Sequence, residues 1–223
     1  MVYRLYSSGI TQRRMAIILR VNRKTIVRKF LFLGYLARKE HERRIESGEL
    51  TTSHAQFDEM ETFEHTRLKP VSVAIAVSAK TAQILGIKCA QMGYKGPLAV
   101  QAREKYGPRE DRTAGAINTV LTIVGRCSTE GATLTTDADP RYLNRVRNVL
   151  PNATHNSIKR RFAKRDRKNA DDHLFTLNYT AAKIRNDLSR MGRKTWVTTK
   201  KLESLQAHLD LYIAFNNNYS IAA

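Results

Sequence analysis

Two aspartates in this chain of 223 residues stand where carboxylates could bind a metal ion. Asp58 lies inside the strand-like segment QFDEMETFEH, and Asp137 ends the segment ATLTTD. An acidic residue is unfavourable inside a strand, which favours a chemical role for Asp58. Carboxylate oxygens are preferred ligands of Mg²⁺ and Mn²⁺, and a pair of such ions can stabilise the attacking and leaving oxygens of a phosphodiester. The two residues therefore favour metal-dependent phosphoryl transfer.

Both acids also have a plain structural interpretation. Asp137 and Asp139 stand just before Pro140, where aspartates commonly cap a helix. Asp58 would in that case be an ordinary surface or turn carboxylate. The sequence leaves both interpretations open.

A third metal ligand is expected on a late helix, and the choice is restricted. No glutamate occurs between residues 131 and 202. The available acids are Asp166, Asp171, Asp172 and Asp187. We rank Asp172 first because it falls at the expected start of a helix. Its alternative role is that of an N-terminal aspartate stabilised by the helix dipole.

The hydrophobic pattern predicts the elements that must position these acids. Strands are predicted at 55–64, 70–79 and 82–91. Later elements are predicted as a helix at 113–126, a strand ending at Asp137, a helix at 140–149, a short strand at 153–158, and helices at 172–191 and 200–215. This is the element order of a ribonuclease H-like domain, an α/β fold with a mixed sheet flanked by helices. Its first and fourth strands are neighbours, so Asp58 and Asp137 are expected to converge.

The N-terminal segment has the spacing of a helix-turn-helix. Thr11 is a plausible N-cap, and the pattern predicts a helix at 12–19, a turn at 20–22 and a second helix at 23–32. Arg20 occupies a turn position where glycine is commoner. The second helix would present basic side chains to DNA phosphates and the major groove: Arg23, Lys24, Arg28 and Lys29. The alternative is an ordinary helical pair, which is frequent in proteins that never contact DNA.

The charge distribution favours a polyanionic partner. The chain has 39 lysines and arginines against 20 acids, a formal net charge of +19. Residues 1–50 contain 12 of these basic residues and residues 159–201 contain 14, whereas the middle of the chain is nearly neutral. A charge of this size repels itself unless a polyanion neutralises it, so double-stranded DNA is the expected partner. The alternatives are a ribosome-associated RNA-binding protein and a merely basic one.

Other features restrict the function further. Cys89 and Cys127 are isolated, so a cysteine zinc site is not supported and both are expected in the core. No apolar run is long enough to span a membrane, and the N-terminus is too polar for a signal peptide. We therefore expect a cytoplasmic, nucleoid-associated protein with no membrane partner.

Four segments carry a resemblance to a known family. They are YSSGITQRRMAIILRVNRKTIVRKF, QFDEMETFEH, TLTTDADPRY and LNYTAAKIRNDLSRMGRKTWVTTKKLESLQAHLDLYIAFNN. Together they resemble bacterial insertion-sequence transposases of the family whose type member is the first-numbered insertion sequence. The tail, RMGRKTW followed by TTKK and a helix ending in NN, is the most specific part, and the resemblance covers nearly the whole chain.

The resemblance implies a DDE-type transposase with a ribonuclease H-like fold, Mg²⁺ or Mn²⁺ as its working ion, and homo-oligomers on DNA. Asp58 matches the first catalytic acid and Asp137 the second. The family's third acid, a glutamate, falls near Asn178, which becomes our second choice after Asp172. Family members with a cysteine-rich module before the helix-turn-helix imply that this chain is a short or N-terminally truncated member. Phosphates near the cut would contact Arg190, Arg193 and Lys194, whose alternative role is a solvated basic face.

The sequence thus predicts a transposase that cuts and joins DNA at element ends. The expected organisation is a helix-turn-helix at 1–35, a helical connector at 36–54, a catalytic domain at 55–195 and a C-terminal helix at 196–223. The rival hypothesis is a non-catalytic relative that occupies element ends as a repressor, which the missing glutamate favours.

Overall fold

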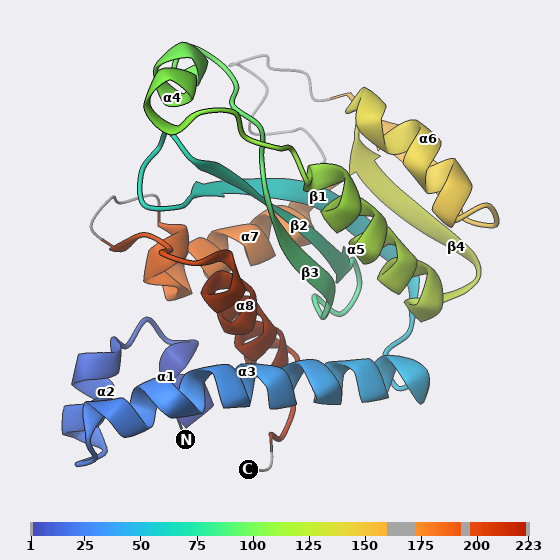
Figure 1. Cartoon of the computed structure of the whole chain (residues 1–223). Coiled ribbons are helices and arrows are strands. Elements are labelled where there is room, and N and C mark those ends of the chain that lie inside the picture. The colour runs from blue at the N-terminus through green and yellow to red at the C-terminus, as the bar shows by residue number, and fades with distance from the viewer. Residues whose placement is uncertain (1, 160–172, 193–196, 222–223) are drawn as a thin grey trace, which may run out of the picture.

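The chain is built around a mixed five-stranded sheet in the order β3-β2-β1-β4-β5 (Figure 1). The computed structural model describes residues 2–159, 173–192 and 197–221. β1 pairs antiparallel with β2 and parallel with β4; β2 and β3 are antiparallel, and β4 and β5 are parallel. The strands are β1 (Thr52–Phe63), β2 (Pro70–Ser78), β3 (Ile84–Gln91), β4 (Ser128–Asp137) and β5 (Thr154–Ile158). The predicted α/β class with a mixed sheet is confirmed, and the sheet is compatible with a ribonuclease H-like fold.

Helices cover both faces of the sheet (Figure 1). The α5 (Thr113–Cys127) and α6 (Pro140–Val149) helices lie on one face, and α7 (Phe175–Asp187) and α8 (Leu202–Asn216) on the other. The remaining helices are α1 (Val2–Tyr6), α2 (Gln12–Ile18), α3 (Arg23–Glu46), α4 (Ala99–Tyr106) and a short 3-10 turn, η1 (Ser189–Met191). Within the described residues, no helix is both long and apolar enough to cross a bilayer.

Strand alternation divides the apolar core into two clusters. Phe57 of β1 packs with the α5 and α6 cluster, and Met60 with the α7 and α8 cluster. The sequence of β2, VSVAIAV, is almost continuously apolar, and the strand is buried on both faces. Half-buried strands instead alternate apolar and polar residues. Cys89 and Cys127 are both buried in the core, as predicted.

Side chains of α8 and of its C-cap residue cover the edge of β3. Gln206 Oε1 accepts a hydrogen bond from the Cys89 backbone N–H at 2.9 Å, and its Nε2 donates to the Ile87 carbonyl at 3.1 Å. Asn217 accepts from the Ile84 N–H at 2.8 Å and donates to the Ile84 carbonyl at 2.9 Å. An open edge would offer these groups to another strand. The C-terminal segment that ends in NN therefore helps to prevent another strand from pairing with the edge of the sheet.

The structure corrects the predicted end of the second N-terminal helix. That helix was expected to stop at residue 32, but α3 continues to Glu46. Its continuation is stabilised by burial of Ala37, His41 and Ile45. Gly34 allows α3 to cross α8 closely, since an added Cβ would lie 2.8 Å from the Ala207 Cβ. The residues predicted as a connector thus belong largely to one long helix that packs on α8.

Candidate functional site

Asp58 and Asp137 lie beside each other on neighbouring parallel strands. The β1–β4 register pairs Gln56 with Thr135 and Phe57 with Thr136. One residue further along each strand, Asp58 stands next to Asp137, and residues so paired project from the same face. Neighbouring strands are about 4.7–4.9 Å apart, so the backbone positions of the two aspartates lie close together. The sequence-predicted convergence of these acids agrees with this register.

The face that carries the two aspartates is the one covered by α7. Gln56, two residues before Asp58 on β1, donates from Nε2 to the His173 carbonyl at 2.8 Å and accepts at Oε1 from the Leu177 N–H at 2.9 Å. Residues two apart on a strand share a face. Asp58 and Asp137 are both half-buried there, so a bound ion would be partly shielded from solvent.

Backbone hydrogen bonds orient both carboxylates. The Glu59 N–H donates to Asp58 Oδ1 at 2.7 Å, and the Asp139 N–H donates to Asp137 Oδ1 at 3.2 Å. The N-cap of α6 is Asp139, whose Oδ1 accepts from the Arg141 N–H at 2.9 Å. The helix-capping role considered for both aspartates therefore falls on Asp139, while Asp137 remains the last residue of β4.

The opposite face holds acids that are paired within the fold. Arg141 Nη2 lies 2.8 Å from Glu59 Oε2 and 2.7 Å from Asp139 Oδ2. The Tyr142 hydroxyl donates to Glu59 Oε2 at 3.1 Å, and the Glu59 side chain is only 6% exposed. Hydrogen bonding to Arg141 lowers the pKa of Asp139. We did not single out Arg141 and Tyr142 from the sequence, although the motif DADPRY contains both.

Tyr142, near the start of α6, is affected by the charges of these acids. Burial raises the pKa of its hydroxyl, and the charges of Glu59, Asp58 and Asp137 raise it further. The negative potential of all three acids therefore reaches one atom at the start of α6. Such a potential attracts a cation.

The third ligand is not settled by the described residues. Asp172, Asp166 and Asp171 lie outside them. Asp187 accepts a hydrogen bond from the Tyr212 hydroxyl at 2.7 Å, which gives it a structural role. Asn178 is half-buried on α7, next to the Leu177 that contacts Gln56.

The residues present fit one hydrated ion better than a closed metal cage. Nowhere in the described part of the chain do three or more His, Cys, Asp or Glu side chains form a group that could hold a metal ion. Mg²⁺ keeps several of its waters and is often bound through one or two carboxylates. The adjacent pair Asp58 and Asp137 therefore suits Mg²⁺, with Mn²⁺ as a close substitute.

The N-terminal helices expose the predicted basic side chains. Thr11 caps α2 and Asn22 caps α3, each through its side-chain oxygen. Between the two helices, Arg20 adopts a positive φ of 51° at the turn position where glycine is commoner. The four basic residues proposed for DNA contact are all exposed on the first turns of α3: Arg23, Lys24, Arg28 and Lys29.

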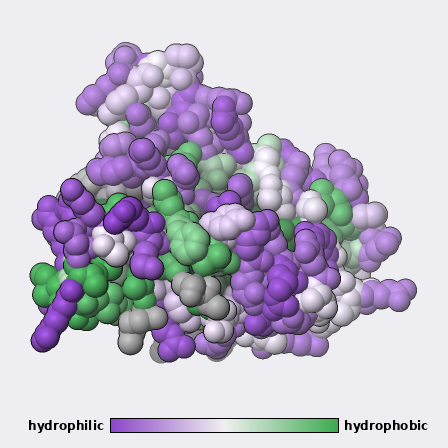
Figure 2. All heavy atoms as spheres, turned by 60° about the horizontal axis from the view of Figure 1, so that its bottom comes forward, coloured by the Kyte–Doolittle hydropathy of each residue, from purple (hydrophilic) through white to green (hydrophobic). Residues whose placement is uncertain are grey.

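An exposed apolar stripe accompanies these basic residues, and the sequence reading missed it. Val27, Leu31 and Tyr35 are spaced four residues apart on α3 and are 45%, 47% and 53% exposed. Ile17 and Ile18 of α2 add to the same region, with 76% and 53% exposure. Figure 2 shows hydrophobic side chains gathered at the left of the face, where α2 and the start of α3 lie. The spacing of apolar residues in the sequence could not identify this exposed stripe, because α3 also has apolar residues on its buried side.

The tail residues give a mixed result. Arg193 and Lys194 lie outside the described residues. Arg190 packs inward rather than on an open basic face, and its guanidinium lies 5.8 Å from the centre of the Phe30 ring. Burial lowers the pKa of Arg190. The expected contact of Arg190 with DNA phosphates is not tested by this position and stays a prediction.

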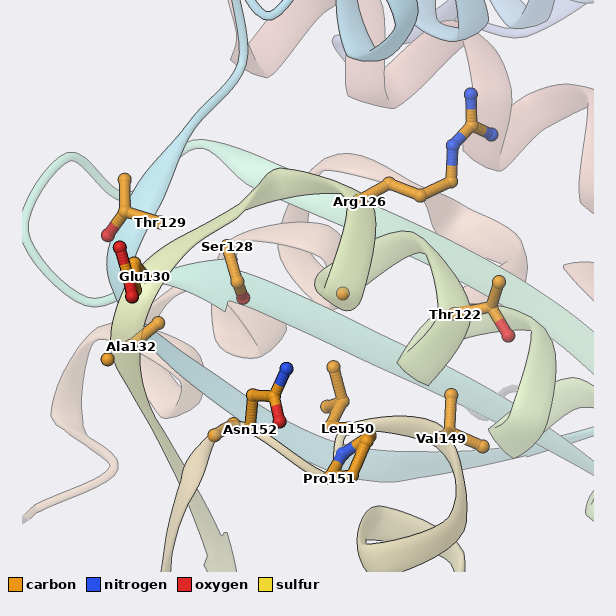
Figure 3. A pocket seen from close by; sticks show the side chains of 13 residues that line it. Thr122, Arg126, Ser128, Thr129, Glu130, Ala132, Val149, Leu150, Pro151 and Asn152 are labelled. Atoms are coloured by element: carbon orange, nitrogen blue, oxygen red, sulfur yellow. The ribbon is translucent and has the colours of Figure 1, made fainter.

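A hollow at the other end of β4 lacks the groups needed for this chemistry. It measures about 600 Å³ and lies between the end of α5, the start of β4 and the loop after α6 (Figure 3). Among the described residues that line it, Glu130 is the only acid and Arg126 the only basic residue. The acids that converge are thus at the carboxyl end of β4, away from this pocket.

Comparison with known proteins leaves the family open. The chain matches no protein-family model, and no curated protein gives a significant match. Membership of the insertion-sequence transposases therefore stays a prediction that rests on the quoted motifs.

Proposed function

We propose that this chain is a DDE-type transposase, which cuts and joins DNA at insertion-sequence ends by metal-dependent phosphoryl transfer. The observation that carries the proposal is the adjacent position of Asp58 and Asp137 on the parallel strands β1 and β4. The strand order and directions, which are compatible with a ribonuclease H-like domain, support it. In this proposal the strands bring together acids that the sequence separates.

The proposed site assigns a task to each residue. Asp58 and Asp137 hold Mg²⁺ or Mn²⁺, with Asp172 as the first candidate for the third ligand and Asn178 as the second. The metal, when bound, stabilises charge on the attacking and leaving oxygens of a phosphodiester. The Glu59 and Asp139 backbone N–H groups fix the carboxylates in place, so little reorganisation is needed when the ion binds.

The basic N-terminal helices are the proposed DNA-binding surface. Their two caps, their short turn and the exposed Arg23 and Arg28 support a helix-turn-helix function. Phosphate contacts position a protein on DNA, whereas contacts to base edges specify a sequence. Replacing both arginines by alanine should weaken binding to the element's own ends by about tenfold or more, and binding to random DNA by less.

Fluorescence anisotropy with DNA flanking the coding sequence measures this difference. Replacing the exposed Arg103 and Lys105 of α4 by alanine removes the same number of positive charges and is the matched control. Affinity should fall steeply with added salt, because neutralised phosphates release counterions. Equal losses of affinity for both DNAs would mean that α3 contacts phosphates without reading the sequence. Binding that does not change with salt would contradict the proposed DNA interface.

A cleavage assay tests the enzymatic proposal. Asp58→Asn and Asp137→Asn should each reduce Mg²⁺-dependent cutting of that flanking DNA by about a hundredfold or more, while DNA binding is kept. Glu130→Gln, an exposed acid near the other end of β4, is the control and should retain activity. Undiminished cutting by either aspartate variant would contradict the proposed site.

A second candidate function has its own support. Among the described residues, no group of three or more His, Cys, Asp or Glu side chains could hold a metal ion, which favours a non-catalytic relative that binds element ends as a repressor. That candidate predicts wild-type protein that binds the ends but cuts nothing with Mg²⁺ or Mn²⁺. The same assay therefore separates the two functions.

A further inference from the structure

A second polar pocket lies where the N-terminal helices meet the segment after α7. It measures about 280 Å³. Its lining includes Tyr6, Thr11, Gln12, Ser189, Arg190 and His208. These residues come from the two ends of the chain, so the pocket forms only when the helical layer is assembled.

Arg190 brings a poorly compensated positive charge to this pocket. None of the ion pairs found between described residues includes Arg190. Its Nη1 is buried without a hydrogen-bond partner. The Phe30 ring, 5.8 Å away, offers a cation–π contact but no hydrogen-bond acceptor. Leaving a buried guanidinium unpaired is costly, and a bound anion would relieve that cost.

His208 adds a neutral acceptor beside this charge. Its Nε2 lies 2.8 Å from the Tyr6 carbonyl, so Nε2 carries the proton and Nδ1 is left with a lone pair. That Nδ1 is also buried without a partner in the described part of the chain. Burial, and then the charge of Arg190, lowers the pKa of His208 to about 3. The imidazole is therefore neutral and suits a ligand that donates a hydrogen bond.

We infer that this pocket binds a phosphate group that keeps a proton on one oxygen, with Arg190 pairing the charge and His208 Nδ1 accepting the O–H. Hydroxyls of Thr11 and Ser189 and the Gln12 amide supply further polar contacts on the wall. Free phosphate and a terminal phosphate monoester share this chemistry, whereas sulfate carries charge without the proton. The site does not depend on the proposed transposase activity.

Nuclear magnetic resonance of the ¹⁵N-labelled wild-type chain tests the inference without a substitution. Inorganic phosphate, titrated at constant ionic strength, should shift the amide signals of Gly9, Thr11, Ser189 and their neighbours. Sulfate at the same ionic strength should shift them much less. Equal responses to both ions, or shifts confined to the exposed basic residues of α3, would overturn the proposal.

Calorimetry on variants gives the second arm. Arg190→Gln should weaken phosphate binding by about tenfold or more, because a charge-assisted hydrogen bond is lost. Arg103→Gln changes the net charge equally at an exposed position and should bind like wild type. Arg190→Lys, which keeps the positive charge, guards against a folding defect and should bind with intermediate affinity. Wild-type affinity in a folded Arg190→Gln would contradict the site.

The same assay distinguishes free phosphate from the terminal phosphate of a nucleic acid. A 5′-phosphorylated oligonucleotide that binds tighter than its 5′-hydroxyl counterpart, with the advantage lost in Arg190→Gln, identifies a DNA terminus. Phosphate binding with no such advantage identifies the free ion.

Discussion

The acids of β1, the end of β4 and the start of α6 form two groups with different partners. On the α6 face, Glu59 and Asp139 are both neutralised by Arg141, and Tyr142 donates to Glu59. On the α7 face, Asp58 and Asp137 stand side by side and accept backbone N–H groups. Strand alternation sends the neighbours Asp58 and Glu59 to different faces.

The comparison separates two acids that share an arginine from an adjacent pair that we propose as metal ligands. A carboxylate with a fixed guanidinium partner contributes to the fold and has little left to offer a ligand. Two adjacent carboxylates repel each other, and a divalent ion relieves that repulsion. The contrast predicts that substitutions on the α6 face act mainly on stability and those on the α7 face mainly on metal binding.

The largest expected effect concerns the third ligand. Asp172→Asn should lower Mg²⁺-dependent cleavage by about a hundredfold if that residue completes the site, and Asn178→Ala should then have a small effect. The cleavage rate on flanking DNA, measured for both variants at equal protein stability, decides between them. A reversed ranking would move the role to Asn178, and two unaffected rates would remove both residues from the site.

A smaller effect is expected when the α6-face pairing is broken. Arg141→Gln should lower the free energy of unfolding by about 1–2 kcal/mol, because the nearly buried Glu59 loses its counter-charge. The value is modest because the Arg141 side chain is 49% exposed. Asp137→Asn should leave stability unchanged or slightly raised. Urea denaturation measures both, with Arg147→Gln on the exposed side of α6 as control. Equal losses of unfolding free energy in Arg141→Gln and Arg147→Gln would contradict a stabilising role for the Arg141 pairing.

The smallest effect is a pH dependence from Asp139. Its pKa is lowered in the folded state by Arg141, so it stabilises the fold above the unfolded pKa of about 4 and loses that contribution as pH falls through the folded value. Asp139→Asn keeps a good N-cap but cannot titrate. Wild type should therefore be more stable than this variant near about pH 6, and the gap should close toward about pH 3. A gap independent of pH would mean that the charge of Asp139 contributes nothing.

Much of the fold was predictable because its elements have strong local signals. Pro140 and Asp139 predicted the α6 helix with the bounds observed, and the run VSVAIAV predicted β2 within one residue. The place of Asp137 at the end of β4 followed from the apolar segment before it. That Asp137 lies next to Asp58 could be predicted only by assuming a sheet topology. The order of the predicted strands and helices suggested that topology.

Long-range contacts account for what the sequence reading missed. Gln206 bonds the backbone of β3 at Cys89 and Ile87, which precede it by 117 and 119 positions in the sequence. No local sequence pattern encodes contacts over such separations. The length of α3 depends on burial against α8, and Gly34 at the crossing marks close approach instead of a helix end. The inward position of Arg190 depends likewise on Phe30 of α3.

The central claim is that Asp58 and Asp137 form a metal-binding pair, and paramagnetic Mn²⁺ tests it most directly. In ¹⁵N-labelled wild-type protein, substoichiometric Mn²⁺ should broaden the amide signals of Asp58, Glu59, Asp137 and Ala138 before any others. In Asp137→Asn that selective broadening should be lost, while in Glu59→Gln it should remain. The account is contradicted if Mn²⁺ broadens these signals no more than those of the distant Glu130, or if Asp137→Asn responds like wild type.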